Sequence, residues 1–580
     1  MTRRSGRRIA LCAAALFVLA QGAAMAASTA VPNRITKPVN ATKDDINPGR
    51  LYLAPALAID PNNQLHVAAA MTELRTKTCF LMRSSDGGHT WVRPNSSPAP
   101  ASYPFCNTNN RGSHQAQIAF GRNGNLYMAF PGWDAQDAGT RGNTSLIVSR
   151  SSDFGNTWTP VVAVDNRGKQ NLDAQGIRPV GGIAVDAKSG SDDIVYVTYA
   201  SRQTNAAAPN AAPNMTSLVV STDGGRKYSA PVLLPVGAFT DQANRDRALT
   251  ARTTIPAAPN ATTTTVVAGS RAAEPNQVAN FGGFEADVTV ADEGTVYAAW
   301  PPATANITPG IPTGIVVSKS TDKGKTWTHT QAVPYAYTND SFVKVAWTPG
   351  GGAQGTVHVF FPGIPRPEVA GYRETWTVHS TDGGKTFTAP AAINPGDGKL
   401  QSGQYYPDVA VAPNGRLDVT WYDTRTDPGY RSNEVYYAYS NDDGKTWSQA
   451  TEISDQPIDR RLGVWSYNYD ITTPPGIASA DKFAVFGWDD TRNNDRTVTD
   501  NAALGGGAQD FYTVAAQFEA IGGGASKTAK LVVAGCVGLL AVGLVLLVVA
   551  LAARSRNGAA PIGSGRAAKK AAPEQKPAKV

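Results

Sequence analysis

Cysteine and histidine are scarce in this chain of 580 residues, with four and six copies respectively. The histidines show neither H-x-x-x-H nor H-E-x-x-H spacing, so the sequence gives no sign of a zinc hydrolase. Gly-Lys-Thr recurs along the chain, but no copy completes a phosphate-binding loop. Charged residues make up only 17% of the chain, and helical periodicity is missing between its two ends. These absences favour an all-β protein.

The two ends differ in composition from everything between them. Met1–Ala26 combines clustered arginines, an apolar run and an Ala-Met-Ala terminus, which is typical of a secretory signal peptide. Leu531–Ala553 is uncharged and long enough, as a helix, to cross a bilayer. A Gly-rich linker, 521–530, precedes it, and the basic tail 554–580 follows, which the positive-inside rule places in the cytoplasm. We therefore expect an extracellular domain held in the cell membrane by one C-terminal helix.

The net charge of +7 does not describe that domain. The predicted signal peptide and the basic tail together carry more positive charge than this net value. The portion between them therefore has a net charge of roughly −3. A domain with this charge has no basic surface for a nucleic-acid backbone. We expect no nucleic-acid partner.

Only two cysteines fall in the exported portion, Cys79 and Cys106, because Cys12 lies in the predicted signal peptide and Cys536 in the predicted span. An oxidising compartment makes a disulfide between them the expected state. Two buried thiols are the alternative.

One eight-residue pattern, Ser-x-Asp-x-Gly-x-Thr-aromatic, recurs with small variations along the exported portion. A fixed pattern at intervals of this kind indicates a repeated supersecondary unit. The Ser and Asp oxygens can bond nearby backbone N–H groups, and the Gly can take a positive φ angle, so the pattern suits a turn between strands. The copies are Ser84–Trp91, Ser151–Trp158, Ser221–Tyr228, Ser320–Trp327, Ser380–Phe387 and Ser440–Trp447.

This pattern resembles the Asp-box of the sialidase-like β-propellers. The copies cannot all serve one active site, so we interpret them as structural turns. Paired apolar strands precede each copy, and a further pair, 470–488, is followed only by the strand Asp510–Phe518. Four strands per unit then predict an all-β, seven-bladed β-propeller over residues 27–520. Val31–Val39 is the candidate strand that completes the last blade. A six-bladed, sialidase-type propeller with an extra hairpin is the alternative.

In such propellers, the site usually lies on the face opposite the A–B turns and the Asp-box turns. Here the loops expected on that face carry many charges, and two of them share the pattern Trp-x-Asp-Thr-Arg, at Trp421–Arg425 and Trp488–Arg492. These residues either form a polar site for a sugar near the axis or brace their own loops.

The resemblance also implies a chemistry. Sialidases cleave terminal sialic acids with a Tyr nucleophile, a Glu that activates it, an Asp acid/base and three Arg that hold the carboxylate. Tyr406, at the head of an inner strand in Gln404–Gly415, matches the Tyr, and Glu285 matches the Glu. Asp423 is the candidate acid/base.

The arginines match less well. Leu53 stands where the family's first Arg is expected, with Arg50 nearby, and the place of the second reads Ala-Trp-Pro-Pro at 299–302. The remaining candidates for a substrate clamp are Arg178, Arg373, Arg425 and Arg492. The sequence thus leaves two functions open. One is an exo-glycosidase acting on terminal sialic or other acidic sugars, and the other is a non-catalytic propeller that binds a glycan or a protein partner.

No cofactor motif is present in the sequence. One polar cluster has oxygen side chains of the kind that Ca²⁺ prefers, although a solvated loop is the alternative interpretation. Its members are Asp489, Asp490, Asn493, Asn494 and Asp495.

Overall fold

The computed structural model of the chain describes residues 32–106, 116–133, 144–166, 172–203, 214–234, 286–301, 314–333, 342–350, 353–363, 374–394, 403–427, 431–463, 474–494 and 507–518. All of them belong to a unit that ends at Ala520. The predicted signal peptide, linker, span and tail lie outside the described residues. In the described part of the chain, no helix is both long and apolar enough to cross a membrane.

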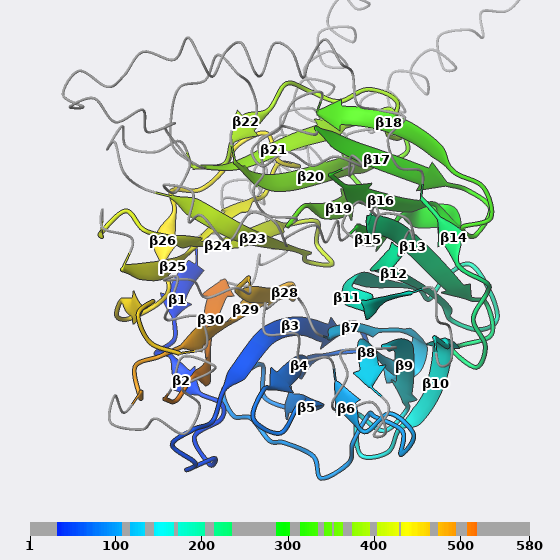
Figure 1. The fold of residues 1–580 in the computed structure, drawn as a ribbon. Coiled ribbons are helices and arrows are strands. Elements are labelled where there is room, and N and C mark those ends of the chain that lie inside the picture. The colour runs from blue at the N-terminus through cyan, green and yellow to red at the C-terminus, as the bar shows by residue number, and fades with distance from the viewer. Residues whose placement is uncertain are drawn as a thin grey trace, which may run out of the picture. The chain divides into compact units, whose positions relative to one another are not determined.

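The described strands form seven antiparallel sheets arranged as a ring of blades (Figure 1). Within a blade, successive strands run from the axis outward. Each inner strand contacts the inner strand of the next blade, and that of the seventh blade contacts that of the first, so the ring is closed. The prediction of a seven-bladed propeller is confirmed. The six-bladed alternative is wrong, because the seventh strand pair forms a blade of its own.

The strands of the first three blades are as follows. Blade 1 contains β3 Tyr52–Asp60, β4 Asn63–Glu73 and β5 Thr78–Ser84; blade 2 contains β7 Gln117–Phe120, β8 Leu126–Trp133, β9 Ser145–Ser151 and β10 Thr159–Val164, with β6 Phe105–Cys106 beside β8; blade 3 contains β11 Leu172–Asp186, β12 Ile194–Gln203, β13 Asn214–Ser221 and β14 Val232–Leu233.

The remaining blades continue the same order. Blade 4 contains β15 Asp287–Val290, β16 Val296–Trp300, β17 Ile315–Ser320 and β18 Thr328–Val333; blade 5 contains β19 Lys344–Thr348, β20 Thr356–Gly363, β21 Glu374–Ser380 and β22 Ala391–Ala392; blade 6 contains β23 Gln404–Val411, β24 Leu417–Asp423, β25 Ser432–Ser440 and β26 Thr451–Glu452, with β27 Ile458–Asp459 beside β25; blade 7 contains β28 Gly476–Ser479, β29 Phe483–Asp490 and β30 Asp510–Phe518. Two single-turn 3-10 helices, η1 Arg122–Gly124 and η3 Asp292–Gly294, connect the first two strands of blades 2 and 4.

The outer edge of blade 7 is supplied by the N-terminal end of the described chain. β1, Pro32–Ile35, pairs antiparallel with β30, and β2, Val39–Asn40, pairs with the same strand further along. The prediction that Val31–Val39 completes the last blade is confirmed for its described residues, from Pro32 onward. The blade is therefore built from segments that lie far apart in the sequence.

The apolar core lies between neighbouring blades. One buried cluster joins blades 1 and 2, another joins blades 2 and 3, and a third joins blades 7 and 1. Close approach of the inner strands requires small residues at particular places. A Cβ atom added at Gly181 would lie 2.2 Å from the carbonyl oxygen of Ala286 on blade 4. Glycine there allows blades 3 and 4 to pack backbone against backbone.

The six repeat turns share one hydrogen-bonding pattern, which Ser320–Trp327 illustrates, except that Ser221–Tyr228 has Lys227 in place of the Thr and lacks its hydroxyl bond. The Ser320 hydroxyl accepts from the N–H of Gly324 at 2.9 Å and donates to Asp322. The Asp322 carboxylate accepts from the hydroxyl of Thr326 at 2.6 Å and from its N–H at 2.9 Å, and these bonds lower the pKa of Asp322 to about 2. Both carboxylate oxygens are thus used inside the turn, which supports a structural role.

Cys79 and Cys106 form a disulfide, as predicted. Cys79 lies on β5 and Cys106 on β6, with their Cα atoms 5.4 Å apart. Since β6 pairs with β8, the bond ties blade 1 to blade 2.

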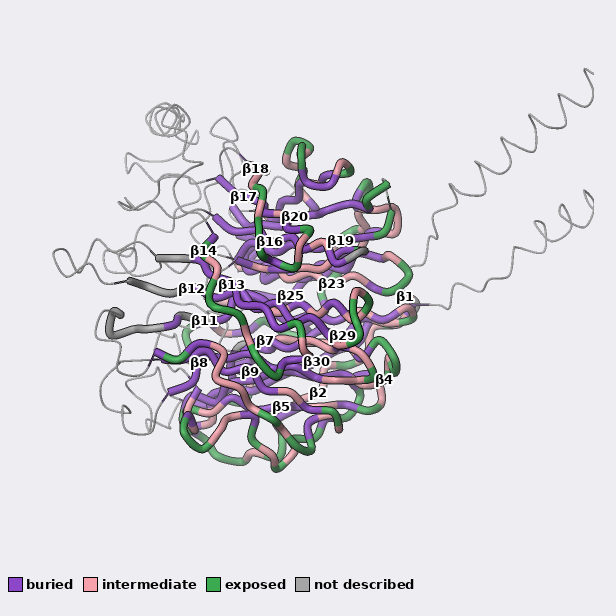
Figure 2. The backbone as a smooth tube through the Cα atoms, turned by 90° about the vertical axis from the view of Figure 1, so that its right-hand side faces the viewer, coloured by how far each residue is buried: buried purple, intermediate pink, exposed green. Residues whose placement is uncertain are grey.

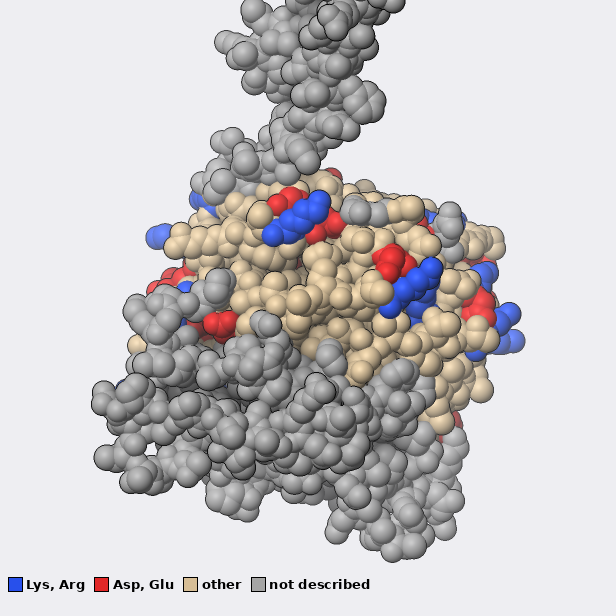
Figure 3. Space-filling view, turned by 90° about the horizontal axis from the view of Figure 1, so that it is seen from above, with Lys and Arg blue, Asp and Glu red and all other residues tan. Residues whose placement is uncertain are grey.

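Charged side chains on the side of the ring shown in Figure 3 mostly lie as small groups of opposite sign on a surface that is otherwise uncharged.

The repeat-turn pattern predicts the effect of removing one hydroxyl. In Ser320→Ala, the buried N–H of Gly324 loses its acceptor, and we expect a loss of about 1–3 kcal/mol in unfolding free energy. Chemical denaturation of the full-length chain measures this loss. Ser191→Ala, at an exposed turn position, is the control, and equal stability of the two variants would contradict the proposed role of the hydroxyl.

Candidate functional site

The structure describes four of the seven residues predicted for catalysis and substrate binding: Tyr406, Asp423, Arg425 and Arg492. Glu285 and Arg373 lie outside the described residues. Arg178 belongs to β11, but its side chain is not described.

Tyr406 has an unusual backbone. It lies in β23, where the pairing with β24 shifts between Tyr405 and Asp408, and its φ angle is +55°. Non-glycine residues rarely adopt this left-handed conformation, and such bulges redirect side chains. The Tyr406 ring is buried, with its centroid 4.5 Å from that of Phe342 and 5.2 Å from that of Tyr405.

Asp423 forms a brace with the residues next to it. Its carboxylate accepts from the indole N–H of Trp421 at 3.2 Å, from the backbone N–H of Arg425 at 2.9 Å and from the Arg425 guanidinium at 2.5 Å. The side chain of Asp423 has no exposed surface. The Arg425 guanidinium stacks on the ring of Tyr436, 4.0 Å from its centroid.

The second copy of the pattern repeats this geometry. Asp490 accepts from the indole of Trp488 and from the backbone and guanidinium of Arg492, all within 3 Å. The Arg492 guanidinium lies 4.1 Å from the centroid of Tyr512 and 2.7 Å from the carboxylate of Asp455. The shared geometry supports the loop-brace interpretation.

These contacts show where the two guanidinium groups point. Tyr436 and Tyr512 belong to β25 and β30, the third strands of their blades, whereas Tyr406 is on an inner strand. The two guanidinium groups thus lie over third-strand tyrosines of their own blades. Arg50, near the expected first arginine, forms two bonds to Asp510, one at 2.5 Å and one at 2.8 Å, which link blades 1 and 7.

Sequence reasoning missed two charged residues on this side of blade 6. Arg460 is 3% exposed, with its guanidinium 5.0 Å from the ring centroid of Tyr405. Glu434 is 1% exposed and lies directly across the sheet from Asp423, and burial raises the pKa of its carboxyl group. The strand pairing of β24 with β25 could have identified Glu434, but no pattern marked Arg460.

The predicted calcium cluster is not assembled as a set of ligands. Asp490 is engaged by Arg492, and the Asn493 amide donates to Asp510 and Tyr512 at 2.8 and 2.9 Å. No group of three or more His, Cys, Asp or Glu suited to a metal lies together in the described part of the chain. Asp495 lies outside that part.

Each inner strand contributes one residue at the same place in its blade, and we call these seven residues the axial ring. Four are charged or polar, and three are small. In blade order they are Ala56, Gln117, Gly182, Asp287, Lys344, Asp408 and Gly476.

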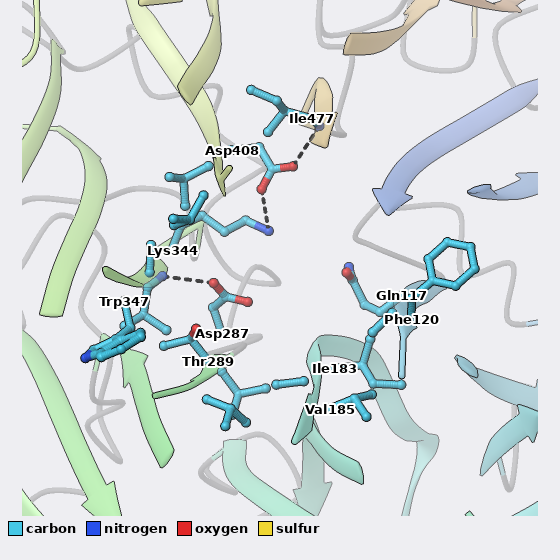
Figure 4. A pocket seen from close by; sticks show the side chains of 18 of the residues that line it. Gln117, Phe120, Ile183, Val185, Asp287, Thr289, Lys344, Trp347, Asp408 and Ile477 are labelled. Carbon is cyan, nitrogen blue, oxygen red and sulfur yellow. Dashed lines mark hydrogen bonds and ion pairs between the residues drawn. The ribbon is translucent and has the colours of Figure 1, made fainter. Parts of the chain in front are cut away.

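Blades 4, 5 and 6 contribute a carboxylate, an amine and a carboxylate to this ring (Figure 4). The amine of Lys344 lies 3.0 Å from Asp408. Each carboxylate also accepts a backbone N–H of the next blade, Asp287 from Val345 at 2.9 Å and Asp408 from Ile477 at 3.2 Å. These bonds join the inner strands of four consecutive blades.

The Asp287 carboxyl group is partly buried, and the loss of hydration raises its pKa to about 6. The charge of Lys344 and the N–H of Val345 oppose the shift, and the charge of Asp408 adds to it. Asp287 is therefore the carboxyl group of the ring whose protonation changes near neutral pH.

A cavity of about 590 Å³ extends from the axial ring toward the A–B turns. Lys188 and Asp292 lie at its rim, where their side chains are 81% and 54% exposed and form an ion pair of 3.2 Å. Many of the exposed turns gather on one side of the ring in Figure 2. Lys188 and Asp292 belong to A–B turns, so the cavity opens among these turns, and neither Tyr406 nor Phe342 lines it.

No family model matches the chain, and no curated protein matches it. Solved structures with a similar fold include the Hadza microbial sialidase Hz136, with 15% identity, a TM-score of 0.38 and coverage of 77% of this chain and 75% of that one. Trypanosoma rangeli sialidase in complex with sialic acid shows 12% identity, a TM-score of 0.37 and coverage of 70% and 54%. Penicillium chrysogenum α-L-arabinanase complexed with arabinobiose shows 16% identity, a TM-score of 0.36 and coverage of 67% and 94%.

The chain is thus similar to β-propeller glycosidases of two kinds. These scores are low, and the propeller fold is established by the seven sheets and their closure.

The raised pKa of Asp287 predicts a pH effect on stability. Between the ordinary value of 3.8 and about 6, the folded state binds more protons than the unfolded state, so the contribution of Asp287 to stability falls as pH rises through this window. The contribution of Asp287 to the unfolding free energy decreases by up to about 3 kcal/mol over this window. We expect Asp287→Asn to abolish it, as measured by unfolding free energies of the full-length chain at pH 4 to 7. Asp192→Asn, on an exposed turn, should keep the wild-type slope, and a wild-type slope in Asp287→Asn would refute the assignment.

Proposed function

We propose that this protein is a membrane-anchored, extracellular propeller that binds a glycan without cleaving sialosides. The glycan site is on the face opposite the A–B turns, around Tyr406. The observation that carries the proposal is the pair of Trp-x-Asp-Thr-Arg braces, in which both guanidinium groups are held over third-strand tyrosines. Sialidase chemistry needs arginines that converge beside the nucleophile.

Aromatic and cationic side chains near Tyr406 support a carbohydrate ligand. The Tyr406 ring contacts the rings of both Phe342 and Tyr405, and Arg460 lies beside Tyr405. Aromatic faces pack against the apolar faces of sugars, while a few placed polar groups give specificity. The buried Arg460 suits an acidic sugar.

The second candidate is an exo-glycosidase with Tyr406 as nucleophile and Glu285 as its activating base, acting on terminal sialic or other acidic sugars. The left-handed backbone of Tyr406 favours it, because strained conformations of this kind cluster at active sites.

One experiment separates the two candidates. The full-length chain in detergent is tested against a fluorogenic sialoside and on an array of acidic and neutral glycans. We expect no turnover, binding to acidic glycans, and binding about 2- to 10-fold weaker in Tyr406→Phe, since one hydrogen bond is lost. Tyr439→Phe on β25, half-buried and remote from the inner-strand end that carries Tyr406, is the matched control and should bind as the wild type does.

Turnover that disappears in Tyr406→Phe would establish the glycosidase and refute the non-catalytic proposal. Absence of both turnover and glycan binding would refute the two candidates together.

The membrane anchor is a separate part of the proposal. Its support is the uncharged run Leu531–Ala553 and the basic residues that follow it. We expect the full-length chain to stay with the membrane fraction after alkaline washing and a chain ending at residue 530 to be released. Release of both would rule out the anchor.

A further inference from the structure

The cavity on the turn side of the axial ring combines apolar side chains in its walls with polar groups at its floor. Its walls are apolar side chains from the inner strands, many of them only partly buried, including Phe120, Ile183, Val185, Trp347 and Val411. Its floor is the polar part of the axial ring. At about 590 Å³, it falls in the size range of small-molecule sites, which combine apolar walls with a few convergent polar groups.

Gln117 provides the observation that points to a ligand. It is 8% exposed, and its side-chain Nε2 has no hydrogen-bond partner among the described residues. Its amide extends into the cavity, across from Lys344 and Asp408 (Figure 4). A buried amide without a partner is costly, which gives a ligand that supplies an acceptor an energetic advantage.

The floor offers both donors and acceptors. Gln117 and Lys344 donate, and Asp287 and Asp408 accept. With a pKa of about 6, Asp287 is mostly neutral at pH 5, so at that pH the charge of Asp408 is balanced by Lys344 and the floor has little net charge. A ligand with a full charge of either sign would meet a like charge at close range, which is unfavourable in a partly desolvated cavity.

We propose that this cavity is a second binding site, distinct from the one around Tyr406, for a small uncharged molecule. The ligand has an apolar body that packs against the inner-strand side chains. Its head is an amide or hydroxyl group that accepts from Gln117 and donates to an axial-ring carboxylate. The site opens on the turn face, so it can be occupied independently of a glycan on the other face.

Three probes with one body and different heads test the ligand class: benzamide, benzoate and benzylammonium. Binding to the full-length chain is measured at pH 5, where Asp287 is mostly neutral, by saturation-transfer NMR with titration at millimolar concentrations. We expect benzamide to bind at least about 10-fold more tightly than either charged probe, because the floor repels both charges.

Variants at Gln117 test the position. Gln117→Leu removes the donor at similar volume, and we expect benzamide to bind about 2- to 10-fold more weakly, the effect of one hydrogen bond. Gln117→Glu keeps the shape and replaces the donor with an acceptor, and it should reverse the preference toward benzylammonium. Gln517→Leu, on β30 and absent from the cavity lining, is the matched control and should bind as the wild type does.

Circular dichroism and thermal melting establish that each variant is folded. If Gln117→Leu fails this check, Gln117→Glu alone decides the test. Failure of all three probes to bind the wild type, a preference for a charged probe, or benzamide binding unchanged in the folded Gln117 variants would overturn the proposal.

Discussion

The antiparallel pairing of β30 with β1 and β2 closes the ring, and the position of every other feature depends on it. A propeller with an open blade would leave the inter-blade core of its first and last blades in contact with water. Here the closing contact is reinforced near the same place by the two bonds from Arg50 to Asp510 and by the core that joins blades 7 and 1. Closure therefore uses backbone pairing, a buried ion pair and apolar packing together.

Closure also brings the seven inner strands together around one central axis. Once the ring is complete, one residue of each inner strand faces the axis at the same level, and the side chains of different blades meet there. Asp287, Lys344 and Asp408 come from segments that are distant in the sequence, and each is an ordinary strand residue by itself. Their charges interact because the closed ring of seven blades brings their inner strands together. The two faces of the ring consequently differ, with an aromatic group around Tyr406 on one side and the cavity with its polar floor on the other.

The repeating parts of the molecule were predictable from sequence, because a repeated unit leaves a repeated pattern. The six turns, the seven strand pairs and the closing segment Val31–Val39 all follow from such patterns. The direction of the Arg425 side chain was not predictable. Trp-x-Asp-Thr-Arg fits a ligand clamp and a loop brace equally well, and the choice depends on Tyr436, whose position relative to Arg425 is set by sheet register. Gln117 and Lys344 were missed for another reason, since each is a single residue with no motif around it. Glu285 and Arg373 remain predictions.

The closing strand has a consequence for how the protein reaches its folded state. Ile35 and its partner Ala516 are about 480 residues apart. β1 therefore has no strand to pair with until nearly the whole domain has been synthesised. Each of blades 1 to 6 can assemble from local contacts as it appears, but blade 7 cannot be completed until β30 is present. Contacts between such distant segments form late and slowly. Until β30 is in place, the first blade therefore carries an apolar side that only the last blade can cover, and the incomplete ring is the form of this protein most exposed to aggregation and proteolysis.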